Sequence, residues 1–86
     1  MTATKQDISR WFDTGATNGQ SHMIVVYDSF DHENYPVYTI TDAQARAKFD
    51  EFDGKTMQWV DEVYDLSMDR NEQLNARRVM NLPPSR

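Results

Sequence analysis

Apolar positions in the first twenty residues follow the period of an α-helix. Three apolar residues recur at spacings of three and four and so share one helical face: Ile8, Trp11 and Phe12. Thr4 and Asp7 have the spacing of a capping box, in which each side chain satisfies an amide of the first turn. The pattern predicts a helix that begins after Thr4 and ends between residues 14 and 18, with Gly15 and Gly19 as points where the chain can leave in a left-handed turn.

The next two apolar segments have the length and residue types of β-strands. Residues 22–28 and 35–40 are short, rich in β-branched and aromatic side chains, and separated by a loop of Asp, His and Asn. We predict an antiparallel hairpin. Both faces of the first strand carry apolar residues, which indicates a central strand. Pro36 cannot donate a ladder hydrogen bond, so it belongs at the start of the second strand or on a sheet edge.

A second helix is expected after the hairpin. Thr41 and Gln44 form another capping box, and apolar residues at helical spacing follow it: Ala45, Phe49 and Phe52. The dipeptide Asp53-Gly54 ends this helix.

The segment at residues 56–66 fits two patterns. Helical spacing connects four of its residues: Met57, Val60, Val63 and Tyr64. Strand alternation connects a different set of three residues in the segment: Val60, Tyr64 and Leu66. We predict a strand, because Asp-Gly interrupts the chain just before it and because Trp, Val and Tyr favour sheets.

A third capping pair predicts the last element. Asp69 and Glu72 begin a helix that extends to about Met80, although its apolar content is thin. The order α-β-β-α-β-α indicates one small α+β domain over residues 1–82, with a three-stranded mainly antiparallel sheet and helices packed on one face. Residues 83–86 form a frayed tail, since two prolines cannot continue a helix.

Composition limits the class of protein. A chain of 86 residues has room for one hydrophobic core. Without cysteine it has neither a disulfide framework nor a thiolate zinc site, which fits a reducing cytosol. The first ten residues lack the pattern of a signal peptide, and no apolar run is long enough to span a membrane. We therefore expect a cytoplasmic protein that does not contact membranes.

Charge is distributed unevenly along the chain. Residues 22–69 carry eleven carboxylates against three Lys and Arg side chains, a net charge of −8, whereas residues 70–86 have a net charge of +3. An acidic body repels phosphate groups, so direct binding to nucleic acid is disfavoured. A basic protein is the better candidate partner, and for a partner that handles nucleic acid the carboxylates would compete for its basic groove.

The acidic loop of the hairpin is a candidate metal site. Asp28, Asp31 and His32 offer ligands for a divalent ion, but the EF-hand pattern fails because Phe30 and Glu33 occupy the third and sixth positions. Asp and Asn also tolerate turn conformations, so the simpler interpretation is a solvated hairpin end. Neither histidine has a serine or cysteine at a spacing that suggests a nucleophile and its base.

Strand aromatics and their acidic neighbours are the candidate partner-binding residues: Tyr38, Trp59, Tyr64, Asp61 and Glu62. Tyr and Trp carry a large apolar body with a polar tip, which suits protein contacts. The alternative is that Trp59 and Tyr64 complete the core. Arg77 and Arg78 lie in the last turns of the expected final helix, where cations favour the helix dipole. They also suit a contact with the acidic body of a second copy, which would form a homodimer.

Two runs of residues carry a resemblance: "HMIVVYDSFDHENYPVY" and "MQWVDEVYDLSMD". They resemble runs in small proteins of unknown role that are encoded by bacteria and their phages, over roughly residues 8–74. The resemblance implies a cytosolic bacterial or phage origin and brings no activity, cofactor or site residue.

Two functional hypotheses follow. The first is a non-enzymatic, cofactor-free interaction module, in the form of a homodimer, which contacts a basic host protein through its acidic surface and strand aromatics. The second is a small-ligand or metal-binding domain, or a minor enzyme, built on residues around the hairpin: His22, Asp28, Asp31, His32 and Glu33.

Overall fold

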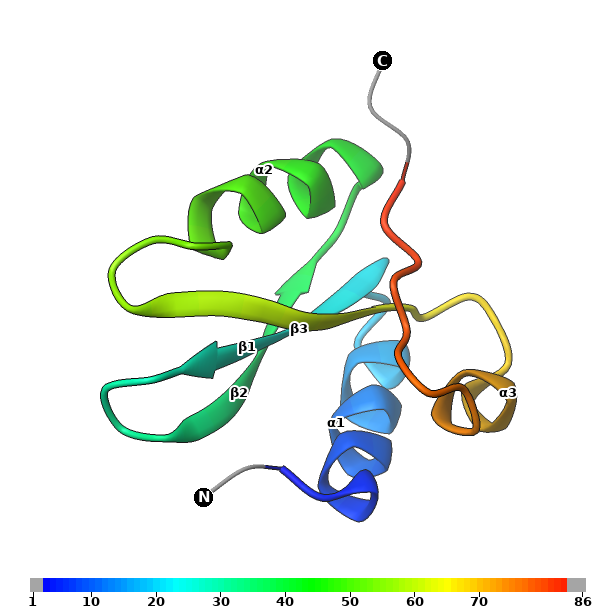
Figure 1. The fold of residues 1–86 in the computed structure, drawn as a ribbon. Coiled ribbons are helices and arrows are strands. Elements are labelled where there is room, and N and C mark those ends of the chain that lie inside the picture. The colour runs from blue at the N-terminus through cyan, green and yellow to red at the C-terminus, as the bar shows by residue number, and fades with distance from the viewer. Residues whose placement is uncertain (1–2, 84–86) are drawn as a thin grey trace.

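Three helices and three strands follow one another along the described part of the chain in the order that the sequence predicts. The computed structural model describes residues 3–83. The elements are α1 (Lys5–Thr17), β1 (His22–Asp28), β2 (Glu33–Thr39), α2 (Asp42–Phe52), β3 (Gln58–Asp65) and α3 (Arg70–Leu74), as Figure 1 shows. The strands form one antiparallel sheet in the order β2-β1-β3. The α+β class, the hairpin and the central position of β1 are confirmed.

Helix α1 begins and ends at motifs that are visible in the sequence. Thr4 and Asp7 form a full capping box, and the hydrogen bond from the Thr4 amide lowers the pKa of the Asp7 carboxyl. At the other end Gly19 has φ +74°, and the amide of Gln20 donates to the carbonyl oxygen of Gly15 at 3.0 Å. This is the left-handed exit of a Schellman motif. Gly15 is not an exit, because it lies inside the helix.

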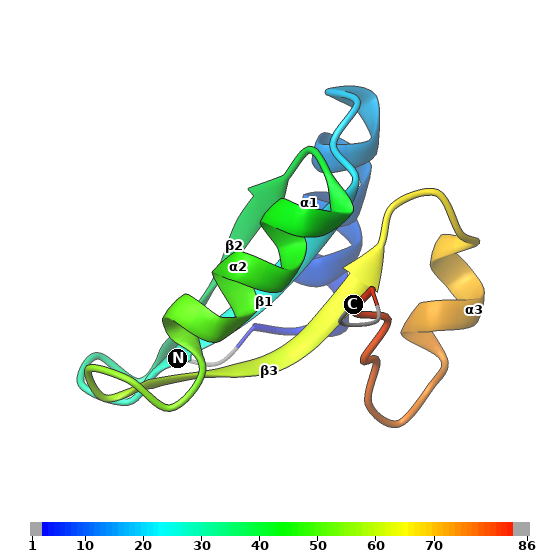
Figure 2. The same ribbon diagram turned by 90° about the horizontal axis from the view of Figure 1, so that it is seen from above.

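The sheet is covered on both faces, so the prediction that the helices pack on one face is wrong. Met23 and Val25 of β1 lie in one core cluster with residues of α1: Ile8 and Phe12. Ile24 and Val26 lie in the other cluster, against residues of α2: Phe49 and Phe52. Figures 1 and 2 show α1 and α2 on opposite sides of the sheet. Successive residues of a strand point to opposite faces, so the run of apolar residues in β1 needs a cover on each side.

Strand β3 contains a β-bulge that neither sequence pattern includes. Val25 pairs with Glu62 and Val26 pairs with Val60, so Asp61 is the extra residue. Val60 and Val63 therefore share the α2 face, whereas Tyr64 and Leu66 lie on the α1 face. The strand is confirmed, but the alternation expected for Val60, Tyr64 and Leu66 is wrong because the bulge shifts its register.

Helix α3 is shorter than predicted. It contains 5 residues and ends at Leu74, not at Met80. Residues 75–82, which we call the C-terminal strap, run beside β3, and Val63 forms a parallel bridge with Met80. Val79 and Leu82 pack against opposite core clusters, so the apolar residues of the strap serve the sheet and not a helix. The predicted tail at residues 83–86 lies outside the described residues except for Pro83.

The outer edge of β3 is occupied by groups from the C-terminal part of the chain. Arg78 donates from Nε to the Asp61 carbonyl oxygen at 2.7 Å and from a guanidinium nitrogen to the Val60 carbonyl oxygen at 3.2 Å. The Gln73 amide group pairs with both the N–H and the carbonyl of Asp65. The prediction that Arg77 and Arg78 lie in the last turns of the final helix is wrong, because α3 ends at Leu74. These bonds block strand addition at this edge. None of the helices within residues 3–83 is long and apolar enough to cross a membrane.

Candidate functional site

An aromatic pair lies at one end of the sheet, on the face that α1 covers only in part, and one of its two rings is exposed. Tyr27 and Trp59 are cross-strand partners whose ring centroids lie 5.1 Å apart with a 40° tilt. Trp59 is 43% exposed. Among the described residues, the chain that leads into α1 contacts this face at Asn34, whose Oδ1 accepts from the Ala3 amide at 2.9 Å. Within residues 3–83 the Trp59 ring is exposed, and Tyr27 beside it is half-buried.

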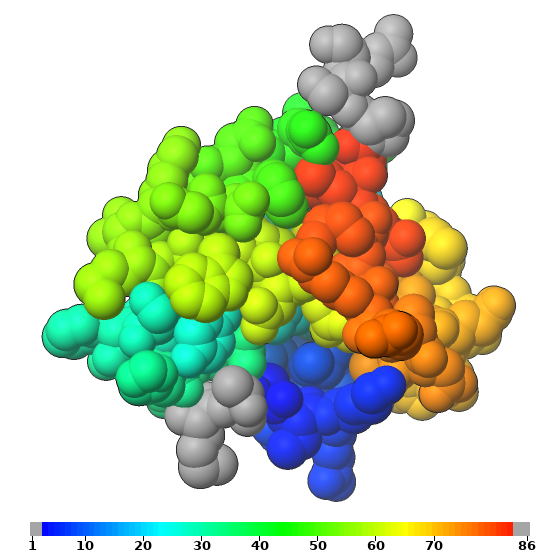
Figure 3. All heavy atoms as spheres, in the orientation of Figure 1, coloured from blue at the N-terminus to red at the C-terminus, as the bar shows by residue number. Residues whose placement is uncertain are grey.

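Two loops meet beside this aromatic pair. We call residues 29–32 and 53–57 the tip. Ser29 joins the loops, because its amide and its hydroxyl both donate to the Met57 carbonyl oxygen, at 2.9 and 2.5 Å. Figure 3 shows the two loops in contact at the left edge of the molecule. Phe30 is 74% exposed and Met57 is 60% exposed. The tip therefore presents two large apolar side chains to solvent on loops that are tied together.

The tip also holds the unfavourable backbone conformations of the described chain. Among residues 3–83 three non-glycine residues have positive φ: His32 at 56°, Thr56 at 54° and Met57 at 61°. Such a conformation costs about 1–2 kcal/mol for an L-residue, and it is least favourable for a β-branched side chain such as Thr56. Strained backbone of this kind is found preferentially at functional sites. Strain and apolar exposure thus coincide here.

Carboxylates are frequent in and beside the tip. Asp31 and Asp53 lie within the two loops and Asp28 and Glu33 lie directly beside the first loop, against the single cation Lys55. Two of them also stabilise the backbone, since Asp28 accepts from the Phe30 amide at 2.9 Å and Asp53 accepts from the Val60 amide at 3.1 Å. The tip is therefore an apolar surface with an acidic rim.

A groove of about 330 Å³ lies next to the aromatic pair on the same face of the sheet. Ile8 and Val25 form its apolar floor. The remaining lining residues are Ala3, Asn34, Asp61, Glu62, Arg77 and Arg78. Asp61 is held in place by Asn34, whose Nδ2 donates to a carboxylate oxygen at 2.9 Å.

Glu62 is fixed on both of its carboxylate oxygens. It accepts from the Tyr64 hydroxyl at 2.7 Å and from the Val79 amide at 3.2 Å. Burial, followed by the neighbouring Glu62 carboxylate, raises the pKa of Tyr64 well above its ordinary value. The Glu62 side chain therefore links the core to the strap at the wall of the groove.

Of the five residues expected to bind a partner, three lie together at this end of the sheet: Trp59, Asp61 and Glu62. The other two, Tyr64 and Tyr38, are covered by α1. Tyr64 is 2% exposed and packs edge-on against Phe12 in the core. Tyr38 is half-buried beneath α1, and its hydroxyl donates to the Trp11 carbonyl oxygen at 2.8 Å. The cover that α1 provides on this face is what encloses both tyrosines.

The acidic hairpin loop is organised as a turn. Asp28 Oδ1 accepts from the amides of Phe30 and Asp31, at 2.9 and 3.4 Å, which closes the loop in the manner of an Asx turn. His32 Nδ1 lies 3.0 Å from the Tyr27 hydroxyl oxygen. Within residues 3–83 no group of three Asp, Glu, Cys or His side chains is placed to hold a metal ion, so Asp28, Asp31 and His32 do not converge.

The alternative ligand site is also not assembled. His22 begins β1 and the acidic loop follows its end, which separates them by about 20 Å at roughly 3.3 Å per strand residue. The His22 ring is buried, with Nδ1 3.1 Å from the Ser21 hydroxyl oxygen. Two carboxylates flank the ring at longer range, Asp42 at 4.0 Å and Asp65 at 3.9 Å. His22 therefore belongs to a different end of the molecule from His32 and Glu33.

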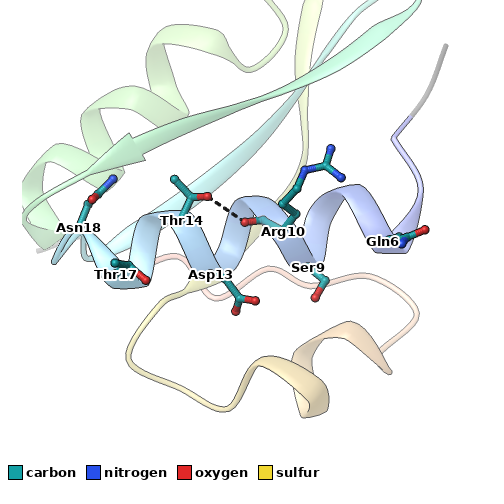
Figure 4. Close-up of a pocket in the computed structure, with 7 residues that line it drawn as sticks. All are labelled: Gln6, Ser9, Arg10, Asp13, Thr14, Thr17 and Asn18. Carbon is teal, nitrogen blue, oxygen red and sulfur yellow. Dashed lines mark hydrogen bonds between the residues drawn. The ribbon is translucent and has the colours of Figure 1, made fainter.

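A shallow hollow of about 540 Å³ runs along the outer face of α1 (Figure 4). Its lining residues come from one helix and the turn that follows it: Gln6, Ser9, Arg10, Asp13, Thr14, Thr17 and Asn18. Its charged groups have partners, since Arg10 pairs with Asp7 and Asp13 pairs with Arg70 of α3. The hollow is therefore a solvated helix face, and its lining residues are not arranged as a catalytic or ligand-binding site.

Sequence reasoning missed Phe30 and Met57, the most exposed apolar side chains of the tip. A signal for Phe30 was present, because a lone aromatic residue in the polar run "DSFDHEN" has no strand or helix face to join. No comparable signal marks Met57, because its position also fits a helical pattern of apolar residues. No protein-family model, curated protein or solved structure matches the chain.

Proposed function

We propose that the protein is a non-enzymatic interaction module that binds a basic protein through the tip and the Tyr27–Trp59 pair. In keeping with its composition and resemblance, we place it in the cytosol of a bacterial cell, as an accessory protein of the host, a phage or another mobile element. The observation that carries the proposal is the coincidence of exposed apolar side chains with strained backbone at the tip.

The energetics of the tip favour a role in binding. A loop selected for stability alone would place glycine or asparagine at positions with positive φ, and a polar residue at an exposed tip. Thr56, Met57 and Phe30 do the opposite. A contact that buries the Phe30 and Met57 side chains would supply about 1.5–3 kcal/mol for each, in line with the usual transfer values. Clusters of this kind form the energetic centre of protein interfaces.

The acidic rim defines the chemistry of the partner. Charges around an interface steer encounter and reject partners of the wrong sign. Asp28, Asp31, Glu33 and Asp53 would attract a surface rich in Lys and Arg and repel nucleic acid. The partner therefore offers an apolar pocket with a basic border.

Other surfaces are less suited to association. The outer edge of β3 is occupied by Gln73, Arg78 and the strap. The outer edge of β2 contains Pro36, which lacks an amide to donate to an added strand. A homodimer that formed through Trp59 would cover the proposed contact surface. The oligomeric state, measured by light scattering, is therefore part of the test.

Affinity capture from a bacterial lysate tests the proposal with three forms of the chain. They are the wild type, the tip variant Phe30→Ser/Met57→Ser, and the control variant Met68→Ser, which removes a side chain that is 51% exposed near α3. Capture is performed at low and at high salt. The captured protein is then purified, and its affinity for each form is measured by calorimetry.

We expect a basic protein that binds the wild type and the control alike. The tip variant should bind it at least tenfold more weakly, since about 1.4 kcal/mol gives a factor of ten. High salt should weaken the interaction, because the rim charges are exposed and screened. Equal affinity of the tip variant and the wild type for every captured protein, or a dimer whose contact covers Trp59, would refute the proposal.

A further inference from the structure

We propose that Tyr27, Trp59 and Asp61 form a site that receives an arginine side chain of the partner protein. This inference rests on the proposed function and specifies the group that the surface recognises. It concerns the aromatic pair and the adjoining groove, and not the apolar side chains of the tip.

The aromatic pair supplies the stacking surface. Trp59 is 43% exposed, and its ring is braced by Tyr27 at 5.1 Å between centroids. A guanidinium group is attracted to the face of an aromatic ring, most strongly to that of Trp, and its planar shape allows it to stack. Within the protein the one cation placed over an aromatic ring in the described chain is Arg46, on Phe49 at 5.9 Å. Within residues 3–83 no cation lies over the Trp59 ring, and its exposed part can receive one from a partner.

Asp61 supplies the countercharge. It follows Trp59 by two residues and lies about 7 Å further along the strand, at the β-bulge. Its carboxylate is turned onto the face of Tyr27 and Trp59 by Asn34, the cross-strand neighbour of Tyr27. One of its two oxygens is used by Asn34, and Arg78 donates to its backbone carbonyl and not to its carboxylate. The second oxygen remains for a hydrogen bond from a guanidinium group.

The groove accommodates the rest of an arginine side chain. Its floor of Ile8 and Val25 suits the apolar methylene stem, which long cationic side chains bury while their charged ends stay polar. Arg77 and Arg78 also line the groove, and Arg78 is held beside the strand by its hydrogen bonds to the Asp61 and Val60 carbonyl oxygens. Their positive charge disfavours a second cation in the groove. The site is thus suited to a single arginine within a basic surface.

Calorimetry with defined peptides tests the site on the whole chain. The probes are hexaarginine, hexalysine and hexaglutamate, at low salt. The variants are Trp59→Leu and Asp61→Asn. Their matched controls are Met68→Leu, which changes an exposed apolar side chain near α3 and outside the proposed contact surface, and Asp50→Asn, which removes the same charge from the exposed side of α2. Circular dichroism verifies that each variant is folded.

We expect hexaarginine to bind more tightly than hexalysine and hexaglutamate not to bind. Trp59→Leu should weaken hexaarginine binding about fivefold to thirtyfold, and Asp61→Asn about threefold to fivefold more than Asp50→Asn does. Fluorescence of the variant Trp11→Phe, in which Trp59 is the remaining tryptophan, should change on titration.

Three results would overturn the inference. They are equal affinity for hexaarginine and hexalysine, no loss in Trp59→Leu relative to Met68→Leu, and no loss in Asp61→Asn relative to Asp50→Asn. None of these results bears on the capture experiment, in which the contribution of Phe30 and Met57 is measured separately. Conversely, loss of the captured partner in the tip variant leaves the arginine site to be decided by the peptides.

Discussion

Replacement of Gly15 by alanine should destabilise the protein, although the same change stabilises most helices. Gly15 lies in the interior of α1, where alanine is ordinarily favoured over glycine by about 1 kcal/mol. The helix, however, packs closely on the sheet at this point. A Cβ atom at position 15 would lie 2.6 Å from Cε1 of Tyr38 and 2.8 Å from Cδ1 of Leu66. Both distances are too short for carbon atoms in contact.

The neighbours of Gly15 have little freedom to move. The Tyr38 ring is held by its hydroxyl, which donates to the Trp11 carbonyl oxygen at 2.8 Å. Leu66 is 8% exposed and belongs to the α1-side core. Overpacking of this kind costs about 1–3 kcal/mol, and two neighbours must yield here, which favours the upper part of the range. After the gain in helix propensity, we expect a net destabilisation of about 1–2 kcal/mol.

Thermal and urea unfolding followed by circular dichroism measure this effect. For a domain of this size, 1–2 kcal/mol corresponds to a decrease in Tm of about 5–15 °C. The control Thr17→Ala, at an exposed position of the same helix, should not lower Tm. In a Tyr38→Val background the ring atoms are absent and only the Leu66 contact remains, so Gly15→Ala should destabilise the protein less than it does in the wild type. A higher Tm for Gly15→Ala in the wild-type background would show that close packing is not the reason for this glycine.

Two further predictions concern the strap and the core tyrosine. Gln73→Ala removes the group that pairs with the N–H and the carbonyl of Asp65 on the edge of β3, so urea unfolding should show a loss of about 2–4 kcal/mol, while exposed Glu72→Ala should change stability by less than about 1 kcal/mol. For Tyr64 the raised pKa favours the neutral form in the folded state, so its contribution is fully present below the ordinary pKa of 10.0 and decreases as the pH rises above that value. Unfolding measured from pH 8 upward should thus show an alkaline decrease that is weaker in Tyr64→Phe, and identical pH profiles for the two proteins would contradict this assignment.

Local signals made most of the fold predictable from the sequence. Thr4 and Thr41 accept hydrogen bonds at the starts of α1 and α2, as their capping patterns indicate. The hairpin followed from two short apolar runs around a polar loop. Each of these features depends on residues that are close in the chain, so a single sequence contains the information.

Features that depend on distant contacts were not predictable. The bulge at Asp61 offsets β3 by one residue and is visible only in its pairing with β1. The sequence places Val79 within the expected last helix. Its contact with the core beside the sheet depends on residues far away in the chain, and no neighbouring residue indicates it. The exposed end of the sheet could not be located either, since it depends on where α1 stops covering Tyr27 and Trp59. The sequence therefore indicated that the candidate site consists of aromatic and acidic residues, but it identified only some of them: Trp59, Asp61 and Glu62.

Mapping the contact on the protein itself tests the central claim most directly. Cross-saturation NMR of the isotopically labelled chain, in complex with the purified captured partner, identifies the residues that lie in the interface. We predict signal loss at Tyr27–His32 and Gly54–Trp59 and at Asp61, with the outer faces of α1 and α2 unaffected. An interface on the outer face of either helix, with Phe30, Met57 and Trp59 unchanged, would contradict the assignment of the tip and the aromatic pair as the contact surface.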